Sequence, residues 1–291
     1  MSKSKSSLKN RGFWYTFPMS AWFTVFFVMP LVIIAVYSFL KKGLYGGVLW
    51  QFSPIAYVKL FTASYGILFM RTLWVSFLVT LICILLALPA GYAIARSKYQ
   101  IIFLFLIIIP FWTNSLIRIN AWIAILGNQG FLNEALKKFG LIQKSLPLMY
   151  NQASVVMVLV YMYLPYSIFP IFSAIDKFDF SLLEAARDLG ATKFGAIRKV
   201  MLPNVRAGIV TSVIFTFIPV FGAYTVPLLV GGKNSYMIGN VIVDQVTKIR
   251  NWPLASAFSV LIALVSTAGV IWMMMLSVKQ ALANKKQGGP V

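Results

Sequence analysis

The segment FDFSLLEAARDLGATKFGAIRKVMLP, residues Phe178–Pro203, is a polar interruption in a strongly apolar chain. Of the 291 residues, 60% are hydrophobic and six are acidic, and the formal net charge is +20. Four of the six acidic residues lie between Asp176 and Asp188. The segment therefore gathers most of the negative charge of a basic chain, and long apolar stretches lie on both sides of it.

The rest of the composition indicates a membrane protein. The mean hydropathy is +0.83 and 11% of the residues are charged, whereas soluble domains carry about 25% charged residues. A hydrocarbon layer of about 30 Å is crossed by about 20 helical residues, and several apolar stretches reach that length. Strands of a membrane β-barrel alternate apolar and polar residues, but runs such as Ile101–Pro110 do not. The sequence therefore predicts an all-α, polytopic membrane protein.

About six membrane spans are expected from the apolar stretches. They are about Ser20–Leu40, Thr72–Ala95, Ile101–Arg118, Ser154–Ala174, Ala207–Val230 and Leu254–Leu276. The third is interrupted by Pro110 and by the polar run Thr113–Ser115. Prolines within other spans favour a packed bundle, because neighbouring helices can satisfy the carbonyls that a proline leaves free. Outside the spans, NEALKKFG is typical of a short surface helix that ends at Gly140.

The distribution of Lys and Arg predicts cytoplasmic N- and C-termini. With six spans in that orientation, 15 of the 26 basic residues fall on the cytoplasmic side and 11 elsewhere. We therefore expect a single transmembrane domain over residues 1–291. It would have a basic cytoplasmic N-terminus at 1–19, a cytoplasmic loop at 175–206 and a flexible cytoplasmic tail at 280–291.

Residue types that are absent or dispersed disfavour several functions. The chain has no histidine and a single cysteine, Cys83, which lies inside an apolar span. Because histidine is the usual general base and the commonest metal ligand, we expect no catalytic, metal or cofactor site. Lys and Arg lie between the spans rather than in one patch, which argues against nucleic-acid binding. No G-x-x-x-x-G-K-[ST] motif occurs, so the chain is not expected to hydrolyse ATP itself.

The acidic loop has the pattern of a helix, a turn and a second helix. Ser181 and Glu184 fit a capping box, in which the two residues bond the backbone amides at the start of a helix. Gly190 can take the left-handed conformation that ends such a helix. Thr192 can cap the following helix, and Pro203 ends it before the fifth span.

Two roles for Glu184 remain open on these features alone, a helix cap or a contact with a partner. Ala185 and Ala186 keep the helix thin enough to enter a groove on another protein.

The loop resembles the EAA signature of ABC-importer permeases, which reads E-A-A, three residues, G, nine residues, I-x-L-P. The matching positions are Glu184, Ala185, Ala186, Gly190, Leu202 and Pro203. Val200 stands where isoleucine is usual. In that family the element is a coupling helix, which docks into a cleft of a separate ATPase subunit.

This resemblance implies the type I, MetI-like fold of ABC-importer permeases in a bacterial cytoplasmic (inner) membrane. The partners that it implies are a second homologous permease, two cytoplasmic ABC ATPase subunits that use ATP-Mg, and an extracytoplasmic solute-binding protein. The lipid bilayer surrounds the spans. The residues expected to couple to the ATPase are Glu184, Ala185, Ala186, Asp188, Leu189, Gly190, Leu202 and Pro203.

A second resemblance covers most of the chain. PFWTNSLIRINAW (residues 110–122), EAARDLGAT, GNVI (239–242) and IRNWPLASA (249–257) are similar to spermidine/putrescine permeases of the PotB type. The substrate-path residues that we expect are Trp112, Asn114, Ser115, Arg118, Tyr224 and Asp244. Polar groups in a span usually face an aqueous path, but Asn114 and Ser115 can instead brace helices, and Arg118 can snorkel to the outer interface.

One departure from that type concerns the substrate. Relatives often carry an acidic residue just before the paired glycines after the fifth span, but Val226–Gly232 contains no carboxylate. The partner permease can supply the negative groups, the binding protein can set the specificity, or the substrate can be another small solute. Such solutes include an amino-acid-like cation, thiamine and a metal complex.

Two other classes are less favoured. A secondary transporter usually has ionisable residues within its spans and inverted repeats, and neither is clear here. A structural membrane protein would not explain the EAA spacing.

Overall fold

The computed structural model describes residues 16–287, with side chains as far as Met275. The predicted basic N-terminus at 1–19 falls almost wholly outside the described residues, and so do residues 288–291 of the predicted tail. The last helix runs through Gln287. It therefore extends past residue 280, where the sequence predicts a flexible tail.

The described part of the chain is mostly helical. Its first helices are α2 (Met29–Tyr37), α3 (Ile55–Leu60), α4 (Ala63–Ala95), α5 (Gln100–Ile108), α6 (Ser115–Leu126) and α7 (Phe131–Lys138). They are followed by α8 (Gln152–Asp176), α9 (Ser181–Asp188), α10 (Lys193–Ala196), α11 (Leu202–Asn204), α12 (Arg206–Phe221), α13 (Thr225–Leu229), α14 (Ile238–Thr247) and α15 (Trp252–Gln287). Short π or 3-10 segments are η1 (Thr24–Val28), η2 (Ile109–Trp112), η3 (Ile197–Met201) and η4 (Lys233–Ser235). Strands β1 (Leu40–Lys42) and β2 (Val48–Phe52) pair antiparallel.

Four helices among the described residues are long and apolar enough to cross a membrane. They are Thr16–Tyr37, Ala63–Ala95, Gln152–Asp176 and Trp252–Met275. They correspond to the first, second, fourth and sixth predicted spans. Two further apolar stretches are bent pairs of helices, and the total becomes six if each pair is counted as one span.

The third predicted span is not a continuous helix. A bend of 93° separates Gln100–Trp112 from Ser115–Lys138. Between them, Thr113 has extended backbone with ψ 147°. The side chain of Asn114 then accepts a hydrogen bond from the Leu116 amide at 2.8 Å, which starts a new helix. The polar run that interrupts the apolar stretch therefore ends one helix and begins another.

The fifth predicted span, Ala207–Val230, is also divided. Helix α12 ends at Phe221, and the chain is not helical again until α13 begins at Thr225. The break contains Gly222, which follows Pro219 by three residues. Both residue types are weak helix formers. Their presence explains why this apolar stretch is not one continuous helix.

The described chain forms two compact units. One runs to Gly66 and includes Ile242–Ala263; the other contains Ile67–Val241 and the last helix from Leu264. In the first unit, the β1–β2 hairpin is an element that the sequence analysis does not predict. Its turn is fixed because the Gly47 amide donates to the Arg250 carbonyl at 2.9 Å, and Gly46 and Gly47 have φ of 98° and 76°.

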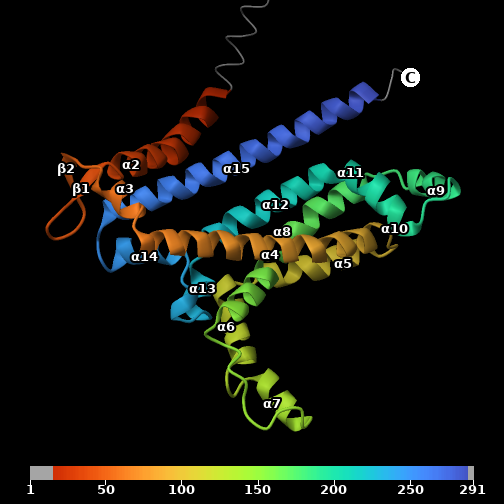
Figure 1. Ribbon diagram of the computed structural model, residues 1–291, viewed down its shortest axis with the longest axis horizontal. Coiled ribbons are helices and arrows are strands. Elements are labelled where there is room, and N and C mark those ends of the chain that lie inside the picture. Colours follow the sequence, from red (N-terminus) through yellow and green to blue (C-terminus); the bar gives the residue numbers. More distant parts are fainter. Residues whose placement is uncertain (1–15, 288–291) are drawn as a thin grey trace, which may run out of the picture. The chain divides into compact units, whose positions relative to one another are not determined.

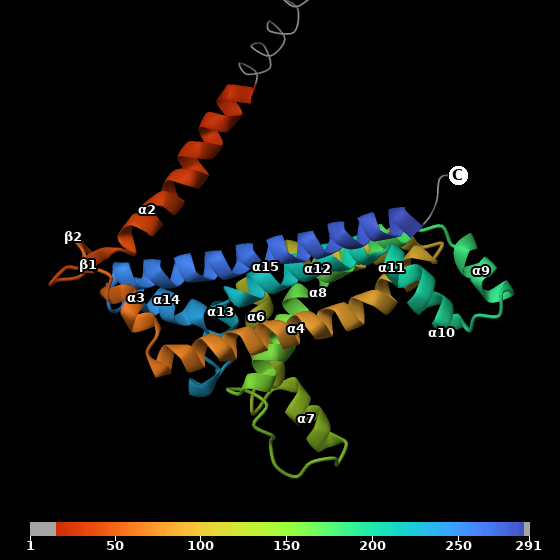
Figure 2. The same ribbon diagram turned by 45° about the horizontal axis from the view of Figure 1, so that its top comes forward.

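Helices α8 and α12 form the central pair of the second unit, and Figure 1 and Figure 2 both show them side by side. A Cβ placed on Gly208 of α12 would lie 2.6 Å from the Pro170 carbonyl oxygen and would collide with Ala174. The two hydroxyl oxygens of Ser167 and Thr216 are 2.6 Å apart and buried. Small residues that allow close backbone approach, together with interhelical hydrogen bonds, are the usual means of helix packing in membranes.

The same unit places two polar segments at opposite ends of α8. Helix α7 lies beyond the first turn of α8, whereas α9 and α10 lie beyond its last turn (Figure 1 and Figure 2). Helix α4 packs along α8, where Gly91 allows it to approach Ile171 and Phe172. The segment around α9 is therefore separated from α7 by the whole length of α8.

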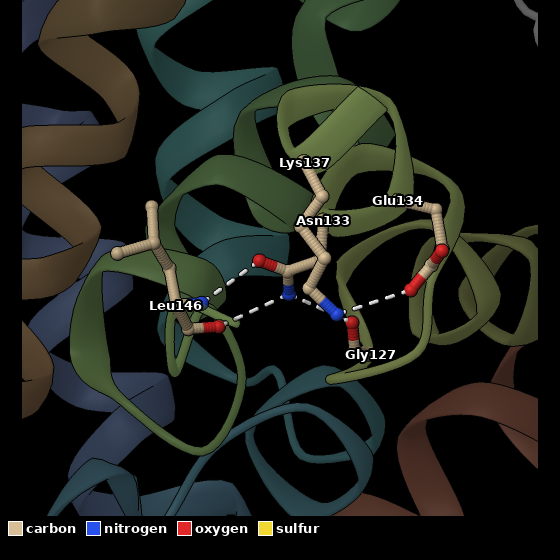
Figure 3. A network of polar contacts seen from close by, with 5 residues as sticks. All are labelled: Gly127, Asn133, Glu134, Lys137 and Leu146. Carbon is tan, nitrogen blue, oxygen red and sulfur yellow. Dashed lines mark hydrogen bonds and ion pairs between the residues drawn. The ribbon is translucent and has the colours of Figure 1, made fainter. Parts of the chain in front are cut away.

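The segment around α7 is held by a single buried amide side chain (Figure 3). Asn133, which is fully buried, donates to the carbonyls of Gly127 at 3.0 Å and Leu146 at 3.1 Å. Its oxygen accepts from the Leu146 amide at 2.8 Å. An ion pair of 3.1 Å joins Lys137 to Glu134 on the surface of the same helix. Helix α7 ends before Gly140, whose φ is 69°, so the predicted surface helix is confirmed.

The first prediction tests the contact between α8 and α12. Gly208→Leu should destabilise the protein by about 1–3 kcal/mol, because the added side chain overfills a closed contact. Gly269→Leu is the matched control, since a Cβ at that residue of α15 meets nothing within 4 Å. Thermal unfolding of the two purified variants in the same detergent measures the difference. Equal midpoints would show that α8 and α12 do not approach as closely as described.

Candidate functional site

The start of helix α9 is capped by Asp179. The Asp179 carboxylate accepts a hydrogen bond from the Ser181 amide at 3.0 Å. Ser181 is the first residue of α9, and Phe180 precedes it without a side-chain cap. The predicted capping box is therefore wrong, because Asp179 bonds the amide that Glu184 was expected to reach. Among the described residues, the Glu184 carboxylate therefore makes no hydrogen bond to the backbone of its own helix.

The Ser181 hydroxyl, and then the Ser181 amide, hold the pKa of Asp179 below its ordinary value. A lowered pKa means that the ionised cap favours the folded loop above the ordinary pKa and is lost as the pH falls through the lowered one. The cap is therefore present at neutral pH.

The end of α9 is fixed by Gly190, which has φ 89°. The Gly190 amide donates to the Arg187 carbonyl at 2.9 Å, and the Ala191 amide donates to the Ala186 carbonyl at 3.0 Å. These two bonds form a Schellman motif, which requires a left-handed residue at the position that Gly190 occupies. The prediction that Gly190 ends this helix in the left-handed conformation is confirmed.

The second helical run of the loop begins as the sequence predicts. The Thr192 side chain accepts from the Gly195 amide at 3.1 Å. The run continues through α10, η3 and α11 as far as Asn204 and then bends by 71° into α12. The bend is at Val205, which is buried and has non-helical ψ.

Helix α9 has one buried face and one exposed face. Leu183 is buried in a cluster with Ile175 and Met201, and this contact fixes the helix to the rest of its unit. We call the larger apolar and the acidic exposed side chains of this segment the α9 surface; they are Leu182, Glu184, Asp188, Leu189 and Phe194, and Arg187 beside them is exposed as well. Leu189 is 90% exposed and Phe194 is 73% exposed. Large apolar groups exposed to this extent next to free carboxylates are typical of a surface that meets another protein.

The remaining predicted coupling residues differ in their exposure. Ala185 and Pro203 are exposed, whereas Ala186 and Leu202 are partly buried against the same cluster as Leu183. Leu182 and Phe194 belong to the α9 surface although the sequence analysis does not single them out. Their exposure could not be predicted, because an apolar residue in an amphipathic loop is more often buried.

The loop is also tied to the ends of the neighbouring helices. The Arg96 guanidinium, just after α4, lies 5.0 Å from the centroid of the Phe180 ring. Phe180 packs edge-on against Tyr92 of α4, and a cavity of about 70 Å³ lies between these residues and α9. The Gln100 side chain at the start of α5 donates to the Asp176 carboxylate at 3.1 Å. These contacts join the α9 loop to the ends of α4, α5 and α8.

The first group of predicted path residues lies at the bend between η2 and α6. Asn114 uses its side-chain oxygen to cap α6, and Trp112 and Ser115 on either side of it are exposed. Asn114 therefore has a structural role at the bend, and its amide nitrogen remains available to a second group.

Arg118 lies one turn further along α6. Its guanidinium carbon is 4.4 Å from the centroid of the Phe111 ring, and Phe111 packs edge-on against Tyr166 of α8 at 5.9 Å. Its Nε and Nη1 atoms are shielded from solvent. Two of the three guanidinium nitrogens are therefore turned away from solvent, while the residue as a whole is half-buried.

Tyr224 lies in the break between α12 and α13. Asn240, which the sequence analysis did not single out, donates to the Tyr224 carbonyl at 2.8 Å and accepts from the Met237 amide at 3.1 Å. Gly239 is required beside it, because a Cβ there would lie 2.6 Å from the Ala223 carbonyl oxygen. The two residues thus hold the break in place, and the GNVI stretch is the sequence signal that marks them.

Asp244 belongs to the other compact unit. Its carboxylate is 2.7 Å from the ammonium group of Lys248, which directly follows the last residue of α14. Trp112, Asn114, Ser115, Arg118 and Tyr224 all belong to the second unit. Among the described residues, no three His, Cys, Asp or Glu side chains are arranged to hold a metal ion.

Residues 80–280 match the family described as the binding-protein-dependent transport system inner membrane component. The chain belongs to this family. The match includes both the α9 loop and the two helix breaks, so the prediction of an ABC-importer permease is confirmed. The family is a transport component of the inner membrane, and its members span the bilayer with several apolar helices.

Curated relatives match over most of the chain. It is 35% identical over 246 residues to the spermidine/putrescine transport system permease protein PotB of Escherichia coli (strain K12), covering 84% of this chain and 90% of that protein. It is 36% identical over 245 residues to PotB of Haemophilus influenzae, covering 82% and 85%. It is also 33% identical over 211 residues to the inner membrane ABC transporter permease protein YdcU of Escherichia coli (strain K12), covering 68% and 67%.

Solved structures confirm the fold. A bacterial ABC transporter involved in the import of the acidic polysaccharide alginate matches with a TM-score of 0.77 at 17% identity, covering 96% of this chain and 99% of that chain. The bacterial alginate transporter in complex with its alginate pentasaccharide-bound periplasmic protein matches with a TM-score of 0.76 at 16% identity, covering 95% and 97%. The fold is therefore that of an ABC-importer permease, as the sequence predicts.

The second prediction concerns the break that holds Tyr224. Asn240→Asp keeps the oxygen that accepts from Met237 but removes the donor to the Tyr224 carbonyl. The Tyr224 carbonyl would keep only the bond from the Leu228 amide at 3.0 Å. Loss of the bond from Asn240 should cost about 0.5–1.5 kcal/mol and should lower both the unfolding midpoint and uptake. Asn234→Asp, at an exposed asparagine six residues earlier, is the control. Identical behaviour of the two variants would contradict the role of Asn240.

Proposed function

We propose that this chain is a permease subunit of a polyamine importer and forms the substrate path together with a second homologous permease. Two separate cytoplasmic ATPase subunits use ATP-Mg to drive the cycle. A solute-binding protein outside the membrane delivers spermidine or putrescine. The observation that carries the proposal is the 35% identity to a spermidine/putrescine permease over 84% of the chain.

The α9 surface is the proposed contact with an ATPase subunit. A short helix with exposed apolar and acidic side chains can enter a groove on a partner. Glu184 then makes a charged contact, while Leu189 and Phe194 supply apolar area. The support for this role is that both ends of α9 are fixed by hydrogen bonds and that Leu183 holds its other face to the unit. Movement of the ATPase subunits would displace α9 as a rigid element.

The proposed transport cycle is alternating access. ATP brings the two ATPase subunits together, and the displacement of α9 is passed to α4, α8 and α12 through the contacts at their ends. The helix breaks at Asn114 and Tyr224 then become accessible from the other side of the membrane. Breaks of this kind are where irregular backbone is tolerated at membrane depth, because there it lines a cavity or is buried in protein.

The proposed orientation places residues 175–206 in the cytoplasm and the α7 segment outside. It is supported by the positions of α9 and α7 at opposite ends of α8 (Figure 1), and by the distribution of Lys and Arg. The solute-binding protein would then meet the side of the chain that carries α7.

The third prediction tests coupling. Glu184→Lys should lower polyamine uptake by ~10-fold or more, because a like charge would face a surface that accepts a carboxylate. Lys98→Glu, a charge reversal at an exposed residue between α4 and α5 that lies outside the α9 surface, should leave uptake near normal. Uptake is measured in cells, and assembly is measured by co-purification of the ATPase. Normal uptake by an assembled Glu184→Lys complex would overturn the proposed role of α9.

The fourth prediction tests the substrate. The complete complex, reconstituted with its solute-binding protein, should hydrolyse ATP faster when spermidine or putrescine is added. Arginine and thiamine, added at equal concentration, should have little effect. Stimulation by arginine or thiamine alone would retain the importer and reject the polyamine.

A further inference from the structure

Arg118 is half-buried, and no counter-charge contacts it among the described residues. Its Nε and Nη1 atoms are buried, and neither has a hydrogen-bond acceptor among the described residues. The Phe111 ring attracts the guanidinium through its π face, but it cannot accept the in-plane N–H groups. A guanidinium has five such donors in a fixed planar arrangement, so the aromatic contact leaves its hydrogen-bonding needs unmet.

The position of Arg118 makes this unmet need costly. It lies at the start of α6, beside Ile119, which is 1% exposed, within a stretch apolar enough to belong to a span. A charge removed from water is tolerated only when it is paired and hydrogen-bonded. Ionisable residues within membrane segments accordingly pair with one another or line functional paths.

The chain's own carboxylates do not provide the pair. All six lie in the described residues. Glu134 and Asp244 are each paired with a lysine three or four residues later, at 3.1 and 2.7 Å. The other four lie from Asp176 to Asp188, at or beyond the last residue of α8.

The distance along α8 places these four acids away from Arg118. Tyr166, which packs against the Phe111 ring under Arg118, precedes Asp176 by ten residues. Ten residues of α-helix rise about 15 Å. That separation is far beyond hydrogen-bond distance.

We infer that Arg118 binds a carboxylate contributed by the second permease. The inference rests on the proposed function for the existence of that partner. A second copy of this chain would bring the same six acids, two of them already paired and four of them at the far end of α8. The substrate of the proposed function is a cation and cannot serve either. The partner's carboxylate lies in one of its membrane segments, because only a group at that depth reaches α6.

This pairing also accounts for an arginine in the path of a polycation. An Arg118 neutralised by a carboxylate no longer repels the substrate, and the carboxylate is a group that an ammonium ion can bind in exchange. The negative charge missing from Val226–Gly232 is then supplied across the interface between the two permeases.

The fifth prediction measures this contact in the complete complex. Arg118→Gln should weaken association with the second permease by ~30-fold or more, as expected when one partner of a buried charge pair is removed. Arg118→Glu should weaken it further, and Arg118→Lys should retain part of it. Lys98→Glu, at an exposed lysine between α4 and α5, is the matched charge-reversal control. Co-purification of the second permease and uptake of spermidine are the two readouts.

A charge exchange identifies the partner and separates pairing from misfolding. Each Asp and Glu in the membrane segments of the second permease is changed to Lys in the Arg118→Glu background. One of these changes should restore assembly and uptake, and it should be harmful when Arg118 is intact. Such a rescue is not expected if Arg118→Glu simply prevents folding.

Three outcomes would overturn the inference. Unchanged assembly and uptake in Arg118→Gln would show that the guanidinium needs no partner. Absence of rescue by every exchanged acid would show that no carboxylate in the membrane segments of the second permease pairs with Arg118. Recovery that depends on anionic lipid would identify a lipid phosphate as the partner of Arg118 instead. If the wild-type chain co-purifies with no second permease, the proposed function itself is rejected. That result is distinguishable from failure of the inference, because it does not depend on any change at Arg118.

Discussion

Backbone groups at membrane depth have no water to bond to, so each helix break must satisfy its amides and carbonyls from within the protein. In this chain, side-chain amides meet that need at the two breaks. Asn114 caps α6 after the bend that follows η2, and Asn240 bonds both the Tyr224 carbonyl and the Met237 amide. Because these bonds are satisfied, the chain can interrupt two apolar stretches without losing stability, and the interruptions are where the candidate path residues lie.

Close helix packing gives these breaks a rigid frame. Gly208 lets α12 touch α8, and the Ser167 and Thr216 hydroxyls bond across the same contact. The arrangement depends on small side chains more than on large ones, since lipid offers no hydrophobic drive for helices to associate. The proposed coupling to an ATPase requires such a frame, because a displacement must pass from one end of α8 to the other.

Length, apolar character and loop charge were enough to predict four of the helices that can cross a membrane, the surface helix before Gly140 and the turn at Gly190. These features depend on local chemistry that a sequence states directly. The bends at Asn114 and after Phe221 were less accessible, because hydropathy does not distinguish a polar residue that caps a new helix from one that faces a path. The capping box failed for a related reason: Asp179 and Ser181 are both good caps, and only the backbone decides which one reaches the amide. The exposure of Phe194 and the isolation of Arg118 depend on packing between distant segments, which spacing in the sequence does not give.

The 71° bend at Val205 changes the direction in which a movement travels. Helical run Lys193–Asn204 lies on one side of it and α12 on the other, with Val205 almost wholly buried between them. The two helical segments act as a bent lever, so that a displacement along the first segment becomes a rotation of α12. An ATPase that closes parallel to the membrane plane could thus tilt a span that stands across it. The angle of the elbow, rather than the length of the loop, would then set how far the path opens for each closure.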